Sequence, residues 1–206
     1  IMASNILRKS VYYCPSKGEP DELRIEKINT LKDLLALSED EVGSIRERIK
    51  KNSPFIWIKR KVDQSLEERL DTLSLDGVYL VDENKRFYPH GKLAAHLLGR
   101  VNIDDEGFSG IELKYKSELE GKKGEYLVMK DAKKRKYRFE TLKEPKPGRD
   151  LILTIDETIQ YYAEKELEKA VIKTGANWGT VIISQPATGE ILAMANYPSY
   201  DLNDPP

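Results

Sequence analysis

Few residues in this chain are of the types that carry chemistry. It has one cysteine, Cys14, and two histidines, His90 and His96. A cysteine–histidine zinc site takes about four ligands, so these counts exclude one, and no disulfide can close within the chain. A single thiol in an apolar stretch is typical of a packed side chain. We therefore expect Cys14 to be structural rather than a nucleophile paired with a histidine.

One acidic stretch resembles the start of a calcium-binding loop. It runs from Asn102 to Gly107 and contains Asp104, Asp105 and Glu106. An EF-hand loop that began at Asn102 would place its bidentate glutamate at position 113, where the chain has Leu113. The pattern favours a solvated turn, and we expect neither a metal nor a cofactor.

Lys173, Thr174 and Gly175 form a tripeptide that some serine acyl-transfer enzymes carry beside their active site. Those enzymes also need Ser-x-x-Lys, because a neutral amine one helical turn from the serine hydroxyl can take its proton. No serine of this chain has a lysine three residues downstream. We expect Gly175 to end a helix and expect no catalytic residue.

A basic run between Lys130 and Arg138 is interleaved with Tyr137 and Phe139. Basic and aromatic residues together can bind nucleic acid, but their alternation is equally typical of a strand with one solvated face. The whole chain has 34 basic and 35 acidic residues, which argues against a nucleic-acid partner. We favour the solvated face and keep, as the alternative function, a polyanion- or lipid-surface-binding module that uses the basic strip 122–149.

The longest apolar run, Ile191–Ala195, is far shorter than the ~20 residues that span a bilayer. We therefore expect the segment itself to be soluble. Charged residues make up 33% of the chain and apolar residues 39%. These values fit a polar, folded segment of one or two domains rather than a disordered chain.

Hydrophobic spacing predicts an α+β fold whose first part is a small lobe at about 20–76. Ser38 with Glu41 three residues later forms a capping box at the start of a helix. Asp63 precedes a second helix start. The other expected elements of this part are strands at 8–14, 55–62 and 77–81 and a helix at 29–37.

The second part begins with a turn at Arg86–Gly91 that leads into a short helix ending at Gly99. Asp156 is placed to cap a helix whose apolar face has Ile159, Ala163, Leu167 and Ala170. The remaining expected elements are a helix from 107–110 to 119, alternating strand and turn over 122–150, a buried strand at 151–155, and a hairpin of 180–184 with 190–195.

Four segments together resemble the N-terminal, non-catalytic part of a class B penicillin-binding protein, a peptidoglycan D,D-transpeptidase. They occur in the family's order between residues 78 and 206. The segments are Arg86-Phe-Tyr-Pro-His-Gly91 continuing to Ala94-Ala95-His96-Leu-Leu-Gly99; Gly107-Phe-Ser-Gly110-Ile-Glu112; Leu153-Thr-Ile-Asp156 with Ile159-Gln160; and Pro186-Ala-Thr-Gly-Glu-Ile-Leu-Ala-Met-Ala195 with Tyr197-Pro198-Ser199-Tyr200-Asp201.

The resemblance implies an elongated pedestal, or dimerisation, domain at 1–150, with the 20–76 lobe as its head. Residues 151–206 would be the first strand, helix and hairpin of a transpeptidase domain. The family's membrane anchor and its Ser-x-x-Lys motif lie outside this stretch, so we expect a segment shortened at both ends. It would lie at the extracytoplasmic face of the bacterial cytoplasmic membrane. The parent would be of the cell-division or the elongation type, and the stretch from Gly124 to Asp131 favours the cell-division type.

The resemblance also implies interaction or inter-domain roles for Arg86, Tyr88, Pro89, Gly91, His96, Gly110 and Glu112. We expect Arg86 and Glu112 to pair across the two helix entries. The implied partners are a SEDS-family glycosyltransferase and other cell-wall and divisome proteins, and a homodimer is a further option. These residues would either hold the pedestal together or transmit partner binding to the catalytic domain.

Overall fold

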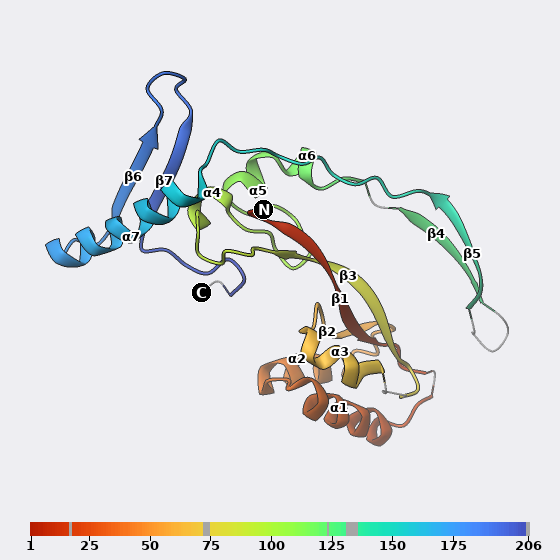
Figure 1. The fold of residues 1–206 in the computed structure, drawn as a ribbon. Coiled ribbons are helices and arrows are strands. Elements are labelled where there is room, and N and C mark those ends of the chain that lie inside the picture. The colour runs from red at the N-terminus through yellow and green to blue at the C-terminus, as the bar shows by residue number, and fades with distance from the viewer. Residues whose placement is uncertain (17, 72–74, 123, 131–135, 205–206) are drawn as a thin grey trace. The chain divides into compact units, whose positions relative to one another are not determined.

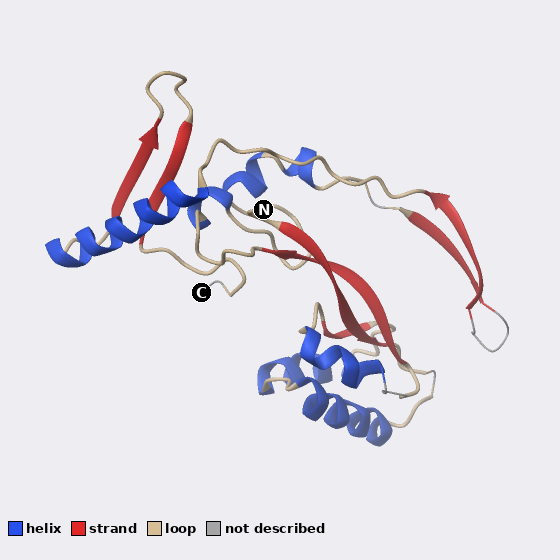
Figure 2. Cartoon of the chain, in the orientation of Figure 1, coloured by secondary structure: helices blue, strands red, loops and turns tan. Residues whose placement is uncertain are grey.

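The computed structural model describes residues 1–16, 18–71, 75–122, 124–130 and 136–204. The chain divides into two compact units (Figure 1). The N-terminal unit is Asn5–Phe87, and the C-terminal unit combines Ile1–Ser4 with Tyr88–Pro206. Both contain helices and strands (Figure 2), as an α+β fold predicts. Within the described residues, no helix is long and apolar enough to cross a membrane.

A three-stranded sheet with the order β2-β1-β3 forms the framework of the N-terminal unit. Its strands are β1 (Ser4–Tyr13), β2 (Ile56–Lys59) and β3 (Val78–Phe87). β1 and β2 are antiparallel, with Tyr13 opposite Ile56. The prediction that β3 ends at residue 81 was wrong. Its second half is rich in charged residues because it lies at the sheet edge, where Asp82 forms an ion pair with Lys9 of β1 at 3.3 Å.

The helices of this unit are α1 (Asp21–Leu35), α2 (Glu39–Lys50) and α3 (Gln64–Asp71). The capping box at the start of α2 is confirmed, since Ser38 and Glu41 each accept a hydrogen bond from the other's backbone N–H. The predicted start of α1 was eight residues too late. The helix begins with the acidic Asp21 and Glu22, and the apolar side chains that follow, Leu23 and Ile25, are exposed rather than part of the buried face. The helices and sheet share one core: Val11, Tyr13, Ile28, Leu31, Leu35, Leu37, Val42, Ile45, Ile49, Ile56, Ile58, Val62 and Leu70.

The first half of the C-terminal unit consists of short elements. They are α4 (Ala95–Leu98), α5 (Gly110–Lys114), α6 (Lys116–Leu119) and the antiparallel hairpin of β4 (Glu125–Lys130) with β5 (Lys136–Lys143). The single helix predicted up to residue 119 is interrupted at Tyr115, whose φ of −112° and ψ of 28° are not helical. The side chains of the basic run lie outside the described residues, so its solvated face stays a prediction.

The second half pairs helix α7 (Glu157–Thr174) with the hairpin of β6 (Gly179–Ser184) and β7 (Ile191–Tyr197). Asp156 caps α7 as predicted, accepting from the N–H of Ile159 at 2.9 Å, and Gly175 ends it in the left-handed conformation. Ala170 is exposed, and Val171 takes its place on the buried face. That core consists of Ala163, Leu167, Val171, Ala193 and Ala195.

The buried strand predicted at 151–155 is absent from that described stretch, and Ile152 is 94% exposed. An apolar run becomes a strand only when a neighbouring strand completes its hydrogen bonds. Here Thr154 donates its hydroxyl hydrogen bond to the carbonyl of Ile191 at 2.6 Å, without forming a ladder.

Candidate functional site: the junction around residues 88 to 99

A tight turn at the start of the C-terminal unit is the centre of the candidate site. The N–H of Gly91 donates to the carbonyl of Tyr88 at 3.0 Å, which closes the turn over Pro89 and His90. Gly91 has a φ of +55°, and a Cβ there would lie 3.0 Å from the Asp201 carboxylate. Both the backbone conformation and the close approach of Asp201 therefore favour glycine at this position.

The C-terminal segment 198–203 folds back onto this turn. Asn203 pairs with the backbone of Tyr88 twice, accepting from its N–H at 3.0 Å and donating to its carbonyl at 2.8 Å. Ser199 donates to the carbonyl of Lys92 at 3.2 Å. Because these bonds use backbone atoms, they fix the position of the segment on the turn.

His96, on α4, makes two further contacts with the same segment. Its Nε2 lies 2.9 Å from the carbonyl oxygen of Pro198. A carbonyl can only accept, so Nε2 carries the proton. The imidazole also packs edge-on against Tyr200, with ring centroids 5.0 Å apart. A small apolar cluster lies beneath these contacts: Tyr88, Ala94, Ala95, Leu98 and Leu202.

Helix α7 contacts the turn through polar side chains. The N–H of Ala94 donates to Glu164 at 2.7 Å, and the same carboxylate oxygen accepts from Gln160 at 2.7 Å. Gln160 in turn bonds both backbone groups of Met194 in β7. The segment 88–99, which we call the junction turn, is therefore linked to the C-terminal segment, to α7 and to the β6–β7 hairpin.

Two glycines allow the next segment to pack closely against α4. Gly99 follows α4 with a φ of 72° and a ψ of −169°, and a Cβ on it would lie 1.9 Å from the carbonyl oxygen of Ser109. A Cβ on Gly110 would lie 2.6 Å from the carbonyl oxygen of Leu97. No side chain fits at either position, so the two glycines bring the end of α4 and the start of α5 together.

The structure brings four of the seven predicted site residues together in the junction turn: Tyr88, Pro89, Gly91 and His96. Gly110 lies against the end of α4, and Glu112 is buried on α5. Arg86 belongs to the N-terminal unit, where it donates to Asn5 at 3.2 Å. Its pairing with Glu112 would join the two units and stays a prediction, as do the roles of all seven residues.

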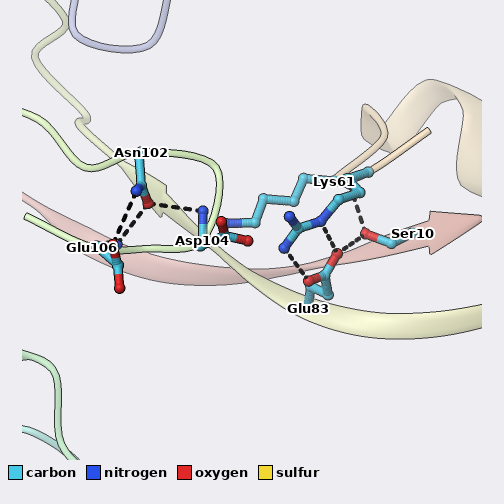
Figure 3. Close-up of polar contacts among 7 residues, drawn as sticks. Ser10, Lys61, Glu83, Asn102, Asp104 and Glu106 are labelled. Carbon is cyan, nitrogen blue, oxygen red and sulfur yellow. Dashed lines mark hydrogen bonds and ion pairs between the residues drawn. The ribbon is translucent and has the colours of Figure 1, made fainter. Parts of the chain in front are cut away.

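The N-terminal unit has a polar network of its own (Figure 3). Glu83 accepts two hydrogen bonds from Arg60, at 2.6 and 3.0 Å, and one from the hydroxyl of the fully buried Ser10. The Ser10 hydroxyl accepts from the N–H of Lys61 at 2.8 Å. The Arg60 guanidinium, and secondarily Ser10, hold the pKa of the Glu83 carboxyl below its usual range despite partial burial. The network ties the chain after β2 to β1 and β3.

The acidic stretch that resembles a calcium loop folds as a turn around Asn102 (Figure 3). The Asn102 side-chain oxygen accepts from the N–H groups of Asp104 and Glu106, both at 2.9 Å. An oxygen used in this way is typical of a turn closed by asparagine. Across the described part of the chain, no three histidine, cysteine, aspartate or glutamate side chains are placed to hold a metal ion.

The sequence pattern assigned no site role to three polar residues of the junction: Gln160, which it placed in a family-like segment, and Glu164 and Asn203, which it did not single out. Gln160 stands three residues before Ala163 on the buried face of α7, and a polar amide in an apolar stripe indicates a specific partner. Glu164 follows one helical turn later. Nothing local marks Asn203, whose partner Tyr88 is 115 residues away in the sequence.

The chain belongs to the penicillin-binding protein dimerisation domain family, whose model matches residues 1–153. It is 36% identical to a probable peptidoglycan D,D-transpeptidase PenA of Neisseria meningitidis serogroup A, over 100% of this chain and 35% of that protein. It is also 36% identical to the peptidoglycan D,D-transpeptidase FtsI of Escherichia coli K12, over 73% of this chain and 26% of the relative. The chain thus spans about a third of the length of PenA.

Solved structures show the same fold. A complex between penicillin-binding protein PBP2 and MreC from Helicobacter pylori matches 98% of this chain and 40% of its own matched chain, with a TM-score of 0.72 and 25% identity. Penicillin-binding protein 2X from Streptococcus thermophilus matches 97% of this chain and 33% of its own, with a TM-score of 0.61 and 21% identity. Residues 1–153 of this chain are therefore a dimerisation domain of the class B penicillin-binding protein type.

Proposed function

We propose that this segment is a non-catalytic scaffold that positions the transpeptidase domain of its parent protein and contacts partners in cell-wall synthesis. The observation that carries the proposal is the junction turn. Residues 88–99 bond to the C-terminal segment, α7 and, through Gln160, to β7. These three elements lie beyond residue 153, where the family model for the dimerisation domain ends. A hydrogen-bonded turn at such a boundary can set the orientation of the next domain.

The positioning role is tested in the full-length parent with Asn203→Ala, because Asn203 joins both backbone groups of Tyr88 to the C-terminal segment. We expect slower acylation by a fluorescent penicillin while the thermal unfolding midpoint stays above the assay temperature. Asn84→Ala, on β3 of the other unit, is the matched control and keeps the parent rate. An unchanged acylation rate in Asn203→Ala would contradict the positioning role.

The partner role rests on family membership and on one structural neighbour, a penicillin-binding protein in complex with MreC. We propose a SEDS-family glycosyltransferase and other divisome proteins as partners, at the extracytoplasmic face of the membrane. The test is binding of this chain, fixed to a surface, to the detergent-solubilised glycosyltransferase of its own organism. If the full-length parent bound the glycosyltransferase and this chain did not, the contact would lie outside residues 1–206 and the proposed partner role of this chain would be refuted.

The expectation that this chain is not acylated by penicillin can be tested directly. Labelled penicillin should leave the isolated chain unmodified, because none of its serines has a lysine three residues downstream. The full-length parent is the positive control. A covalent adduct on the chain, detected by intact mass, would show that a nucleophile is present in the segment.

A further inference from the structure

Ala94 has a backbone conformation that its side chain does not favour. It precedes α4 with a φ of 54° and a ψ of 28°, in the left-handed region. A residue with a Cβ is uncommon there. Ala94 is buried, with only 2% of its surface exposed, and its N–H donates to the Glu164 carboxylate at 2.7 Å. The left-handed turn is therefore held by a charged acceptor from another element.

The same carboxylate oxygen holds Gln160, which has no exposed surface. The Gln160 amide donates to Glu164 at 2.7 Å and to the carbonyl of Met194 at 3.0 Å. Its oxygen accepts from the N–H of Met194 at 2.7 Å. The amide orientation is thereby fixed, since its nitrogen points at two acceptors and its oxygen at one donor.

These contacts form one chain of hydrogen bonds from Ala94 through Glu164 and Gln160 to Met194. Its two ends are far apart in the sequence, and a single oxygen atom, Oε1 of Glu164, accepts from both sides. A partly buried chain of hydrogen bonds favours one arrangement, because losing one member leaves its neighbours without a bond.

We propose that Glu164 is a positioning residue that couples the junction turn to strand β7 through Gln160. The inference rests on the proposed scaffold function and names the side chains that carry it. Removing the carboxylate takes the acceptor from the Ala94 N–H directly. It also leaves the Gln160 amide free to rotate. The two hydrogen bonds between Gln160 and Met194 therefore weaken, even though Glu164 itself does not contact Met194.

Amide hydrogen exchange on the isolated chain tests this coupling without any catalytic assay. In Glu164→Ala we expect exchange to speed up about tenfold at both Ala94 and Met194, which is the scale of one lost hydrogen bond. Glu168→Ala, an exposed position one turn further along α7, should change neither amide. Faster exchange at Ala94 with no change at Met194 would overturn the coupling and leave Glu164 as a local cap.

Two further variants make the test independent of how well Glu164→Ala folds. Glu164→Gln keeps a neutral acceptor and should show a smaller change of the same sign at both amides. Gln160→Ala should speed exchange at Ala94, to which Gln160 makes no direct bond, because coupling acts in both directions. Unchanged exchange at Ala94 in Gln160→Ala, or strictly additive effects in the Glu164→Ala, Gln160→Ala double variant, would also overturn the proposal.

The coupling and the scaffold function can fail separately. If exchange at Met194 responds to Glu164→Ala but the Asn203→Ala variant of the full-length parent is acylated by penicillin at the parent rate, the coupling is present and the scaffold function is wrong. If acylation slows in the Asn203→Ala parent but Met194 does not respond to Glu164→Ala, the scaffold function stands and the coupling route is wrong.

Discussion

The two units of this chain are stabilised in different ways. In the N-terminal unit, three helices and a sheet share one continuous apolar core. In the C-terminal unit, small clusters of mainly alanine and leucine are separated, and polar side chains bonded to backbone atoms join the elements. Apolar burial is nondirectional and tolerates small shifts, whereas hydrogen bonds fix relative position. The comparison indicates that apolar burial stabilises the N-terminal unit, whereas directional hydrogen bonds define the geometry of the C-terminal unit.

The largest effect should come from the apolar core. Leu35→Ala removes a fully buried side chain of α1 and should lower the free energy of unfolding of the N-terminal unit by about 2–5 kcal/mol. Leu23→Ala, on the same helix but 43% exposed, should cost less than about 0.5 kcal/mol. Urea unfolding followed by Trp57 fluorescence in a Trp178→Phe background reports this unit alone. Equal costs for the two variants would contradict the shared core.

Glycine substitutions should have opposite signs in the two units. Gly99→Ala places a Cβ 1.9 Å from a backbone oxygen at a positive φ and should destabilise the C-terminal unit by about 1–3 kcal/mol or more. Gly43→Ala, on α2 with nothing within 4 Å of the added Cβ, should stabilise the N-terminal unit by about 0.5–1 kcal/mol. Urea unfolding followed by Trp178 fluorescence measures the Gly99→Ala variant, and unfolding followed by Trp57 fluorescence measures the Gly43→Ala variant. If both substitutions changed the free energy of unfolding in the same direction, the contrast would be refuted.

Acid should weaken the N-terminal unit through Glu83. Arg60 lowers the pKa of Glu83 in the folded state, so the folded state binds fewer protons than the unfolded chain as pH falls. The stabilisation is present at neutral pH and is lost as acid protonates the carboxyl. Glu83→Gln should cost about 1–2 kcal/mol at pH 7 and flatten the decline in stability below about pH 5. The pH dependence of stability is measured as the midpoint of urea unfolding at a series of pH values, with Glu47→Gln, at an exposed position, as the control. Parallel pH profiles for the unmodified chain and Glu83→Gln would show that Glu83 is not the group responsible.

The smallest effects should come from matched helix caps, one in each unit. Ser38→Ala and Asp156→Ala each remove a side-chain acceptor at a helix N-terminus and should each cost about 1 kcal/mol. The first should shift only the Trp57 transition and the second only the Trp178 transition. A cap variant that shifts both transitions equally would show that the units unfold together.

The sequence predicted what local chemistry determines. The side chains of Ser38 and Asp156 cap helices by accepting hydrogen bonds from the N–H groups three residues later. Gly175 ends a helix because its backbone adopts the left-handed conformation. Length and pairing were harder to predict. β3 continues to Phe87 because β1 lies beside it, and the apolar run at 151–155 has no strand beside it in the described part of the chain. In both cases the deciding partner is distant in the sequence.

The candidate site also has one part that is local in the sequence and one part that depends on distant residues. The resemblance to known proteins identified Tyr88, Pro89, Gly91 and His96, whose turn is compact in sequence. It did not identify the partners of that turn, because the bonds from Ala94 to Glu164 and from Tyr88 to Asn203 span 70 and 115 residues. Only the three-dimensional arrangement shows which distant polar group completes a local motif.

The return of the C-terminal segment to the junction turn has a consequence for how the chain folds. The Ser199–Lys92 and Asn203–Tyr88 bonds close loops of 107 and 115 residues. Closing so long a loop costs conformational entropy before its contacts repay it, and such non-local contacts slow folding. The core of the N-terminal unit and the α7–hairpin contact involve shorter separations and can form first. The junction is therefore expected to assemble last, as the closing step of folding.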